Sequence, residues 1–227
     1  MSREHVISQS VFTHGCDCPM TTDGGHRVPA GRLGKGGLTA KILCDHHNSI
    51  LAPLDNEAGK LADFILNPAK FPNRIELSGP LLERWTLKTI INGLVAGWSD
   101  RRKWLPDPQV ASAAFGVTAI PKGCGLLTVD GDTTDMTSPQ AASVTPIWEL
   151  PPGEKRLIGA YARVHGLKLF FAVDPTAVER IAGAVAVESV TEGTGGRFVY
   201  RPPWIGMGNR DGYQRGVILC WSHSFAD

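Results

Sequence analysis

The segment from residue 14 to residue 37 most limits what this chain can fold into. It contains the stretches CDCP, TTDGGH and GRLGKGG, which show neither helical nor strand periodicity. Irregular stretches of this length are uncommon inside a domain, and they are usually functional or bound to something. Short strand patterns lie on either side of it, at residues 4–12 and 38–44. The chain is therefore expected to begin with two strands separated by a long loop.

A helix is predicted immediately after the second strand. Asp45 can cap it, and apolar residues at positions 50–65 recur at steps of one, three or four, as in an amphipathic helix. Pro53 removes a backbone hydrogen bond, so it must either kink this helix or begin a second one. Another helix is predicted over residues 79–98, with a proline suited to its first turn.

The second half of the chain shows strand patterns and no motif of recognisable chemistry. Residues 156–173 are predicted to form a hairpin around His165 and Gly166, and residues 197–200 and 216–221 are further strand candidates. With the helices of the first half, this pattern predicts the α+β class.

Composition narrows the class of protein. The 227 residues are 42% hydrophobic and 20% charged, which excludes wholesale disorder as well as collagen-like and coiled-coil designs. No apolar run reaches the ~18–20 residues of a membrane helix, and the first dozen residues lack the apolar core of a signal peptide. A cytoplasmic protein without a membrane partner is expected. The net charge of +1 excludes a polycation but not local basic patches.

One constellation of residues indicates chemistry. Glu4 and His5 occur in the first strand, and a C-x-x-H-N stretch from Cys44 to Asn48 joins the second strand to the helix. Here the sequence resembles the HNH endonuclease family. EHVISQSVF is similar to the family's E-H-I/V-I-P stretch, and LCDHHNSILAPLD is similar to its C-x-x-C/H-N…D stretch. The resemblance covers roughly residues 3–66, and Ser8 replaces the usual proline.

The resemblance implies a ββα-metal motif with roles for particular residues. His5 matches the family's general base and Glu4 its first metal ligand. Asn48 matches the middle asparagine, which ligates the metal or orients the base. The family often ends its motif with a histidine, and here no histidine occurs between positions 47 and 165. Asp55, seven residues after Asn48 and so on nearly the same helix face, is the predicted third ligand, with Glu57 in reserve.

These residue types suit phosphodiester hydrolysis. An imidazole whose ordinary pKa is about 6.5 can accept a proton from water. Hard cations such as Mg²⁺ or Mn²⁺ prefer oxygen ligands and keep several waters, so two or three protein oxygens suffice. The expected cofactor is therefore one Mg²⁺ or Mn²⁺ ion.

A zinc site is the less favoured alternative. Cys16, Cys18 and Cys44, with His46 or His47, are ligand types that Zn²⁺ accepts. The C-x-C spacing is not the usual C-x-x-C, and Cys44 is better explained as a small buried residue at a strand end. Structural Zn²⁺ is thus possible but not preferred.

Nucleic acid, most simply DNA, is the expected partner. Phosphate contacts need positive charge and little sequence precision. The run at 100–104 is equally well explained as a solvated charge run, and a double-strand break by a single motif per chain would need a homodimer or two encounters. The candidate phosphate-binding residues are Arg3, Lys41, Arg101, Arg102 and Lys103.

The sequence thus predicts three units: an HNH-like ββα-metal module at 1–72, a helical connector at 73–105, and an α+β extension with an antiparallel sheet at 106–227. The expected activity is metal-dependent endonuclease cleavage by a His-activated water. The alternative is a catalytically silent module, stabilised by zinc or by its core, that binds nucleic acid or protein.

Overall fold

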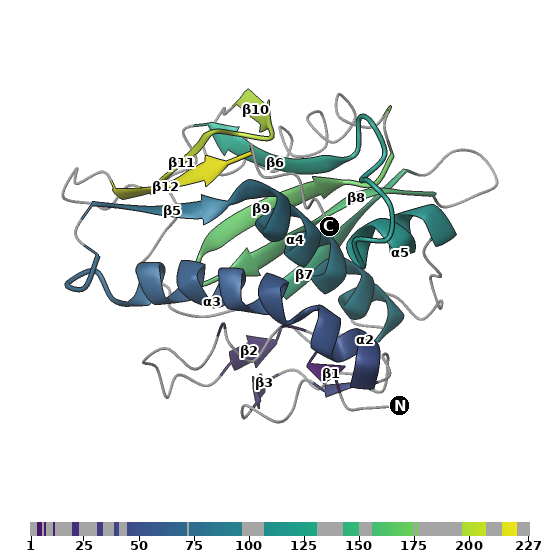
Figure 1. The fold of residues 1–227 in the computed structure, drawn as a ribbon, viewed down its shortest axis with the longest axis horizontal. Coiled ribbons are helices and arrows are strands. Elements are labelled where there is room, and N and C mark those ends of the chain that lie inside the picture. The colour runs from purple at the N-terminus through teal and green to yellow at the C-terminus, as the bar shows by residue number, and fades with distance from the viewer. Residues whose placement is uncertain are drawn as a thin grey trace.

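The chain folds into helices packed on antiparallel strands, which confirms the predicted α+β class (Figure 1). The computed structural model describes residues 4–5, 7, 11, 20–22, 31–33, 39–40, 45–71, 73–96, 107–130, 143–149, 156–174, 176, 197–207 and 215–221. Among these residues, no helix is both long and apolar enough to cross a membrane.

The N-terminal strands are very short. β1 (Glu4–His5) pairs antiparallel with β4 (Thr39–Ala40), and β2 (Met20–Thr22) pairs antiparallel with β3 (Gly31–Leu33). The segment between the two predicted strands, expected to be loop, therefore contains a small ladder of its own. A ladder of three residues per strand is too short to produce a visible period-two pattern, so the sequence does not reveal it.

Two helices follow, and Pro53 lies at the start of the second. This is one of the two alternatives expected for this proline, the other being a kink in a single helix. α2 (Asp45–Ile50) ends before Leu51, and α3 (Ala52–Leu66) begins with Pro53 in its first turn. Proline is well placed there because the first backbone N–H groups of a helix have no partner within the helix. The chain therefore bends between α2 and α3, and we call this junction at Leu51 the α2–α3 elbow.

The predicted helix at 79–98 is confirmed as α4 (Gly79–Val95), but it follows a strand that was not predicted. β5 (Arg74–Ser78) leads directly into α4, and the Ser78 hydroxyl accepts a hydrogen bond from the Leu81 N–H at 3.4 Å. A short helix, α5 (Pro108–Ala114), was also not predicted.

Five antiparallel strands form the larger sheet, in the order β10-β6-β9-β8-β7. The predicted hairpin is confirmed, with His165 and Gly166 both at positive φ, as a two-residue turn of the I′ type requires. α4 lies across this sheet in Figure 1. The strands are β6 (Gly125–Asp130), β7 (Ser143–Glu149), β8 (Arg156–Val164), β9 (Leu167–Ala172) and β10 (Arg197–Tyr200).

The smaller sheet joins distant parts of the chain. β11 (Trp204–Met207) pairs antiparallel with β12 (Arg215–Cys220), and β12 pairs parallel with β5. The predicted antiparallel extension therefore describes the larger sheet but not the smaller one. In the smaller sheet, β12 of the extension pairs in parallel with β5, which lies in the segment predicted to be a helical connector. Parallel pairing needs a long crossover connection, which no local pattern predicts.

One buried cluster contains residues from all three predicted units. Side chains of α3 and α4 pack there against residues of both sheets and of the N-terminal segment. The positions 72 and 106 thus do not coincide with a break in the core. Members of the cluster include Ile7, Val11, Leu61, Phe64, Leu82, Trp85, Leu126, Val164, Leu169 and Val217.

Candidate active site

The predicted general base and first metal ligand lie on β1. Glu4 pairs with Ala40 and His5 with Thr39, so the backbone of both residues is held against β4. Their side chains lie outside the described part of the chain. α2 begins five residues after β4, at Asp45. Along the chain, β1 is therefore followed by β2 and β3, then by its partner β4, and then by α2.

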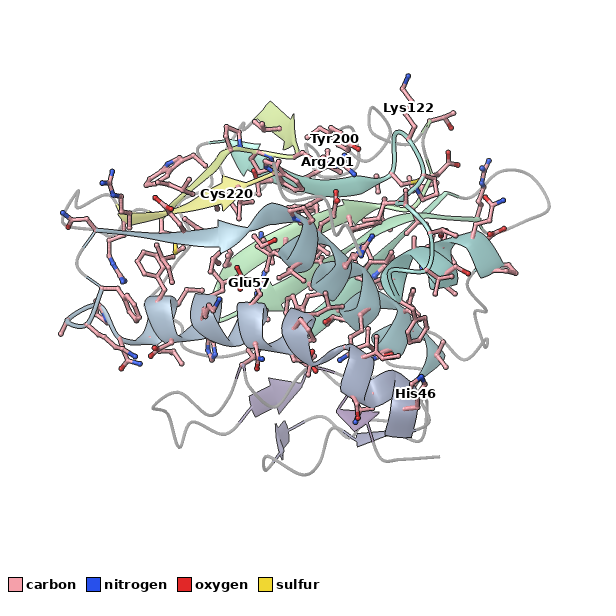
Figure 2. The ribbon with its side chains drawn as sticks, in the orientation of Figure 1. His46, Glu57, Lys122, Tyr200, Arg201 and Cys220 are labelled. Carbon is pink, nitrogen blue, oxygen red and sulfur yellow. The ribbon has the colours of Figure 1, made fainter. Side chains whose placement is uncertain are left out.

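Asn48 lies on α2 close to the elbow. Its side chain is half-buried, and its carbonyl oxygen accepts a hydrogen bond from the Leu51 N–H at 3.2 Å. His46, on the same helix, is exposed and is seen at the edge of the molecule in Figure 2. Asn48 is thus less accessible to solvent than His46, and its backbone carbonyl is hydrogen-bonded in the turn between α2 and α3.

Asp55 is held by a buried lysine. Both of its carboxylate oxygens lie 2.9 Å from Lys88 Nζ, which comes from α4. The Lys88 side chain is 4% exposed and that of Asp55 22%. Asp55 also lies in the first turn of α3, where the helix dipole favours a negative charge. A metal ion bound by Asp55 would have to share the carboxylate with this ammonium group.

The reserve ligand, Glu57, is directed elsewhere. It is buried and accepts hydrogen bonds from the Ser78 N–H at 2.5 Å and from Lys60 Nζ at 2.8 Å. Figure 2 shows it on the stretch of α3 that faces β5 and α4. Glu57 therefore links α3 to the start of α4 through Oε1, and its Oε2 pairs with Lys60 of its own helix.

Several other predicted residues lie outside the described residues. Among the described residues, no group of three or more histidine, cysteine or acidic side chains is arranged to hold a metal. The donor types of Glu4, Asn48 and Asp55, which are all oxygens, nevertheless fit Mg²⁺ or Mn²⁺ rather than zinc. The residues outside the described part are Arg3, Lys41, Arg101, Arg102, Lys103, Cys16, Cys18 and Cys44.

A buried carboxylate on α4 is the strongest electrostatic feature that the sequence analysis missed. Glu83 accepts hydrogen bonds from the Leu126 N–H at 2.9 Å and from Arg201 Nε and Nη2 at 2.9 and 3.1 Å. Burial acts to lower the pKa of Arg201, but the hydrogen bond and the charge of Glu83 outweigh it and raise that pKa. Nothing in the local sequence around either residue points to this pair.

Aromatic rings enclose the same arginine. The Arg201 guanidinium lies 5.4 Å from the centre of the Tyr200 ring and 5.6 Å from that of Trp221. The Tyr200 hydroxyl donates to the Cys124 carbonyl at 2.8 Å. In Figure 2 Tyr200 and Arg201 lie on the side of the molecule opposite to α2. This arrangement joins α4 to β6 and β10, and its charges are matched within the fold.

The described cysteines are ordinary buried or half-buried thiols. Cys124 and Cys220 are both free, and burial raises the pKa of Cys124 from 9.0 to about 11, with further contributions from Asp174 and Glu83. A thiol with a raised pKa is a poor nucleophile and a poor metal ligand at neutral pH. Neither residue was predicted to act in the site.

No protein-family model, curated protein or solved structure matches this chain.

Proposed function

We propose that this protein is a metal-dependent endonuclease of the HNH type, which hydrolyses phosphodiester bonds in nucleic acid, most simply DNA. The observation that carries the proposal is the order of the N-terminal elements. β1, with Glu4 and His5, pairs with β4, and α2, with Asn48, begins five residues later. This order accompanies the E-H-V-I and C-x-x-H-N stretches of the sequence.

In this proposal His5 acts as the general base. One of its ring nitrogens accepts a proton from water, and the oxygen of that water attacks phosphorus. The carboxylate of Glu4 and the amide oxygen of Asn48 would hold a divalent cation. A bound Mg²⁺ or Mn²⁺ would stabilise negative charge on the phosphate and favour departure of the leaving oxygen.

Asp55 contributes least in this scheme. Its two oxygens already accept hydrogen bonds from Lys88, so its charge is compensated without a metal. The ion pair is also compatible with the alternative function, a catalytically silent module, stabilised by zinc or by its core, that binds nucleic acid or protein. The difference between the two functions lies in whether cleavage occurs.

Cleavage of supercoiled plasmid tests the proposal. Purified protein is incubated with plasmid and with Mg²⁺, Mn²⁺ or excess chelator, and the nicked circular product is measured. A single motif per chain should nick one strand, so nicked circles should precede linear DNA. Nicking should require the cation and disappear with chelator. Nicking that persists in excess chelator would exclude the metal mechanism, and plasmid binding without nicking would favour the silent module.

A further inference from the structure

The outer face of the smaller sheet carries an exposed tryptophan. Trp204 lies on the edge strand β11 and is 44% exposed, whereas Ile205 and Met207 of the same strand are buried in the core. In Figure 1 the strands β5, β11 and β12 lie on the side of the molecule opposite to β1. A binding surface at Trp204 would therefore be distinct from the candidate active site.

Two glycines allow the indole ring of Trp204 to lie flat on the sheet. Gly206 and Gly216 are directly opposite each other in the ladder between β11 and β12. A Cβ atom at Gly216 would overlap Cζ2 of Trp204 and the two ring atoms bonded to it, Cη2 and Cε2, so Gly216 contacts the face of the ring rather than its edge. A Cβ atom at Gly206 would lie 3.3 Å from the indole Nε1. Gly216 is buried beneath the ring, which leaves the opposite ring face towards solvent.

A positive charge stands beside this ring. Arg74 of β5 is exposed and pairs with Gly216, on the side of β12 away from Trp204. Neighbouring strands lie ~5 Å apart, so the Arg74 side chain begins next to the end of the ring that covers Gly216. Within the described part of the chain, the Trp204 indole N–H and the Arg74 guanidinium make no hydrogen bond or ion pair. We call Trp204, Gly206, Gly216 and Arg74 the tryptophan platform.

We propose that the tryptophan platform binds a nucleotide of single-stranded nucleic acid, with its base stacked on Trp204 and its phosphate paired with Arg74. The choice of nucleic acid as the partner rests on the proposed nuclease function. Any base can stack on an aromatic ring, and a guanidinium group matches phosphate in charge and geometry. The bases of a duplex already stack on one another, so the platform requires an unpaired base. A proline-rich peptide could also pack on Trp204, but it would leave Arg74 without an anion.

Binding of fluorescein-labelled oligothymidylate tests the platform independently of cleavage. Affinity is measured by fluorescence anisotropy in chelator, at several salt concentrations. Trp204→Ala should weaken binding about 5–150-fold, the usual range for loss of one stacked base, and Trp204→Phe, which keeps a ring, should weaken it less. Arg74→Gln should reduce the slope of log affinity against log salt by ~0.7, the contribution of one phosphate contact with a single strand.

Three variants provide matched controls. Lys122→Gln removes one positive charge from an exposed residue outside the platform, at the edge of the molecule in Figure 2, and should leave the slope unchanged. Val117→Ala shortens an apolar side chain that is 78% exposed, and it should leave the affinity unchanged. Glu76→Gln removes a negative charge from the same face of the sheet, since Glu76 is exposed and pairs with Ile218, the partner of Trp204. It should strengthen binding.

Thermal melting verifies that each variant is folded. The inference would be overturned if the wild type did not bind the oligonucleotide, if Trp204→Ala bound it normally, or if Trp204→Ala weakened binding of a duplex equally. Preferential binding of a polyproline peptide would also overturn it. If Trp204→Ala does not fold, wild-type affinity in Trp204→Phe together with a wild-type slope in Arg74→Gln would overturn it.

Plasmid nicking separates this inference from the proposed function. If the wild type nicks plasmid while Trp204→Ala binds the oligonucleotide normally, only the platform fails. If Trp204→Ala and Arg74→Gln have the expected effects but the wild type does not nick, the platform is supported and the nuclease proposal fails.

Discussion

The N-terminal strands and the body of the protein differ in how much regular secondary structure holds their charged residues. In the body, formed by α3, α4 and the two larger sheets, three buried charged residues have partners within the fold. Glu83 pairs with Arg201, Lys88 with Asp55, and Arg215 donates to the Phe64 and Phe71 carbonyls at 2.6 and 2.8 Å. In the N-terminal region, Glu4 and His5 lie on a strand of two residues.

The comparison shows that a buried carboxylate is not by itself a sign of catalysis. Glu83 is 3% exposed and has a charged partner, as catalytic carboxylates often do, but its hydrogen bonds connect α4 to β6 and to Arg201. Residues that act on a substrate need access to it. The body therefore uses its charges for stability, and the N-terminal region is where we expect the reaction.

Loss of the proposed general base should have the largest effect. His5→Ala should reduce the nicking rate by on the order of 10²–10⁴-fold, because no other group would accept the proton of water. The melting temperature should stay unchanged, because the residue lies on a strand of only two residues.

His46→Ala is the matched control for this loss, since His46 is an exposed histidine on the neighbouring helix. It should nick plasmid at the wild-type rate. A folded His5→Ala variant with full activity would show that the imidazole takes no part in the reaction. Unfolding of His5→Ala would instead show that His5 is needed for the fold, as the paired charges of the body are.

The opposite result is expected for Glu83. Glu83→Ala should lower the free energy of unfolding by about 3–5 kcal/mol, since it leaves the Leu126 N–H and Arg201 without their acceptor. Denaturant unfolding measures this loss, and Glu76→Ala, an exposed carboxylate on β5, should stay within ~0.5 kcal/mol of wild type. Folded Glu83→Ala should nick at the normal rate. A folded variant with impaired nicking would place part of the reaction in the body.

Asp55 and Lys88 lie where the two regions meet. Asp55→Asn leaves a buried ammonium without its carboxylate, whereas Lys88→Met leaves a carboxylate that still reaches solvent. We expect Asp55→Asn to be the more destabilising of the two, with Lys88→Met costing about 1–3 kcal/mol.

Asn48→Ala should raise the Mg²⁺ concentration for half-maximal nicking more than Asp55→Asn does. A larger shift for Asp55→Asn would make Asp55 a principal ligand and move it into the reacting region.

The smallest effect concerns Cys124. Its pKa is raised from 9.0 to about 11, so the native state holds the thiol proton more tightly than the unfolded state does. The stability that this proton provides is fully present below pH 9 and is lost as the pH rises towards 11. Melting temperatures should therefore fall across this window, and Cys124→Ala should reduce the fall. Cys220→Ala should not, and equal curves for all three proteins would contradict the assignment.

Local patterns were sufficient for much of the fold. The α3 helix, the role of Pro53 at its start, α4 and the β8–β9 hairpin follow from apolar periodicity, proline position and a two-residue turn. α5 was missed although Asp107 and Pro108 provide a capping signal, because seven residues are too few to show a periodic face.

The order of the candidate site also came from the sequence, since Glu4, His5 and Asn48 were placed by short motifs. Their convergence on one cation remains a prediction, because it depends on side chains of β1 and α2 that belong to different segments. The carboxylate of Asp55 could not be assigned from its spacing alone, since its partner Lys88 is 33 residues away.

The sequence by itself determined the α+β class, the principal helices and the hairpin, because each depends on residues close together in the chain. The resemblance from which we propose a nuclease is also local, and it stays a prediction. Only the tertiary structure decided the parallel pairing of β5 with β12, the Glu83–Arg201 pair and the contact of His165 with the Val11 carbonyl. Those features depend on pairing and burial between residues up to about 150 positions apart, as for His165 and Val11. Local propensity carries no information about which distant groups become neighbours.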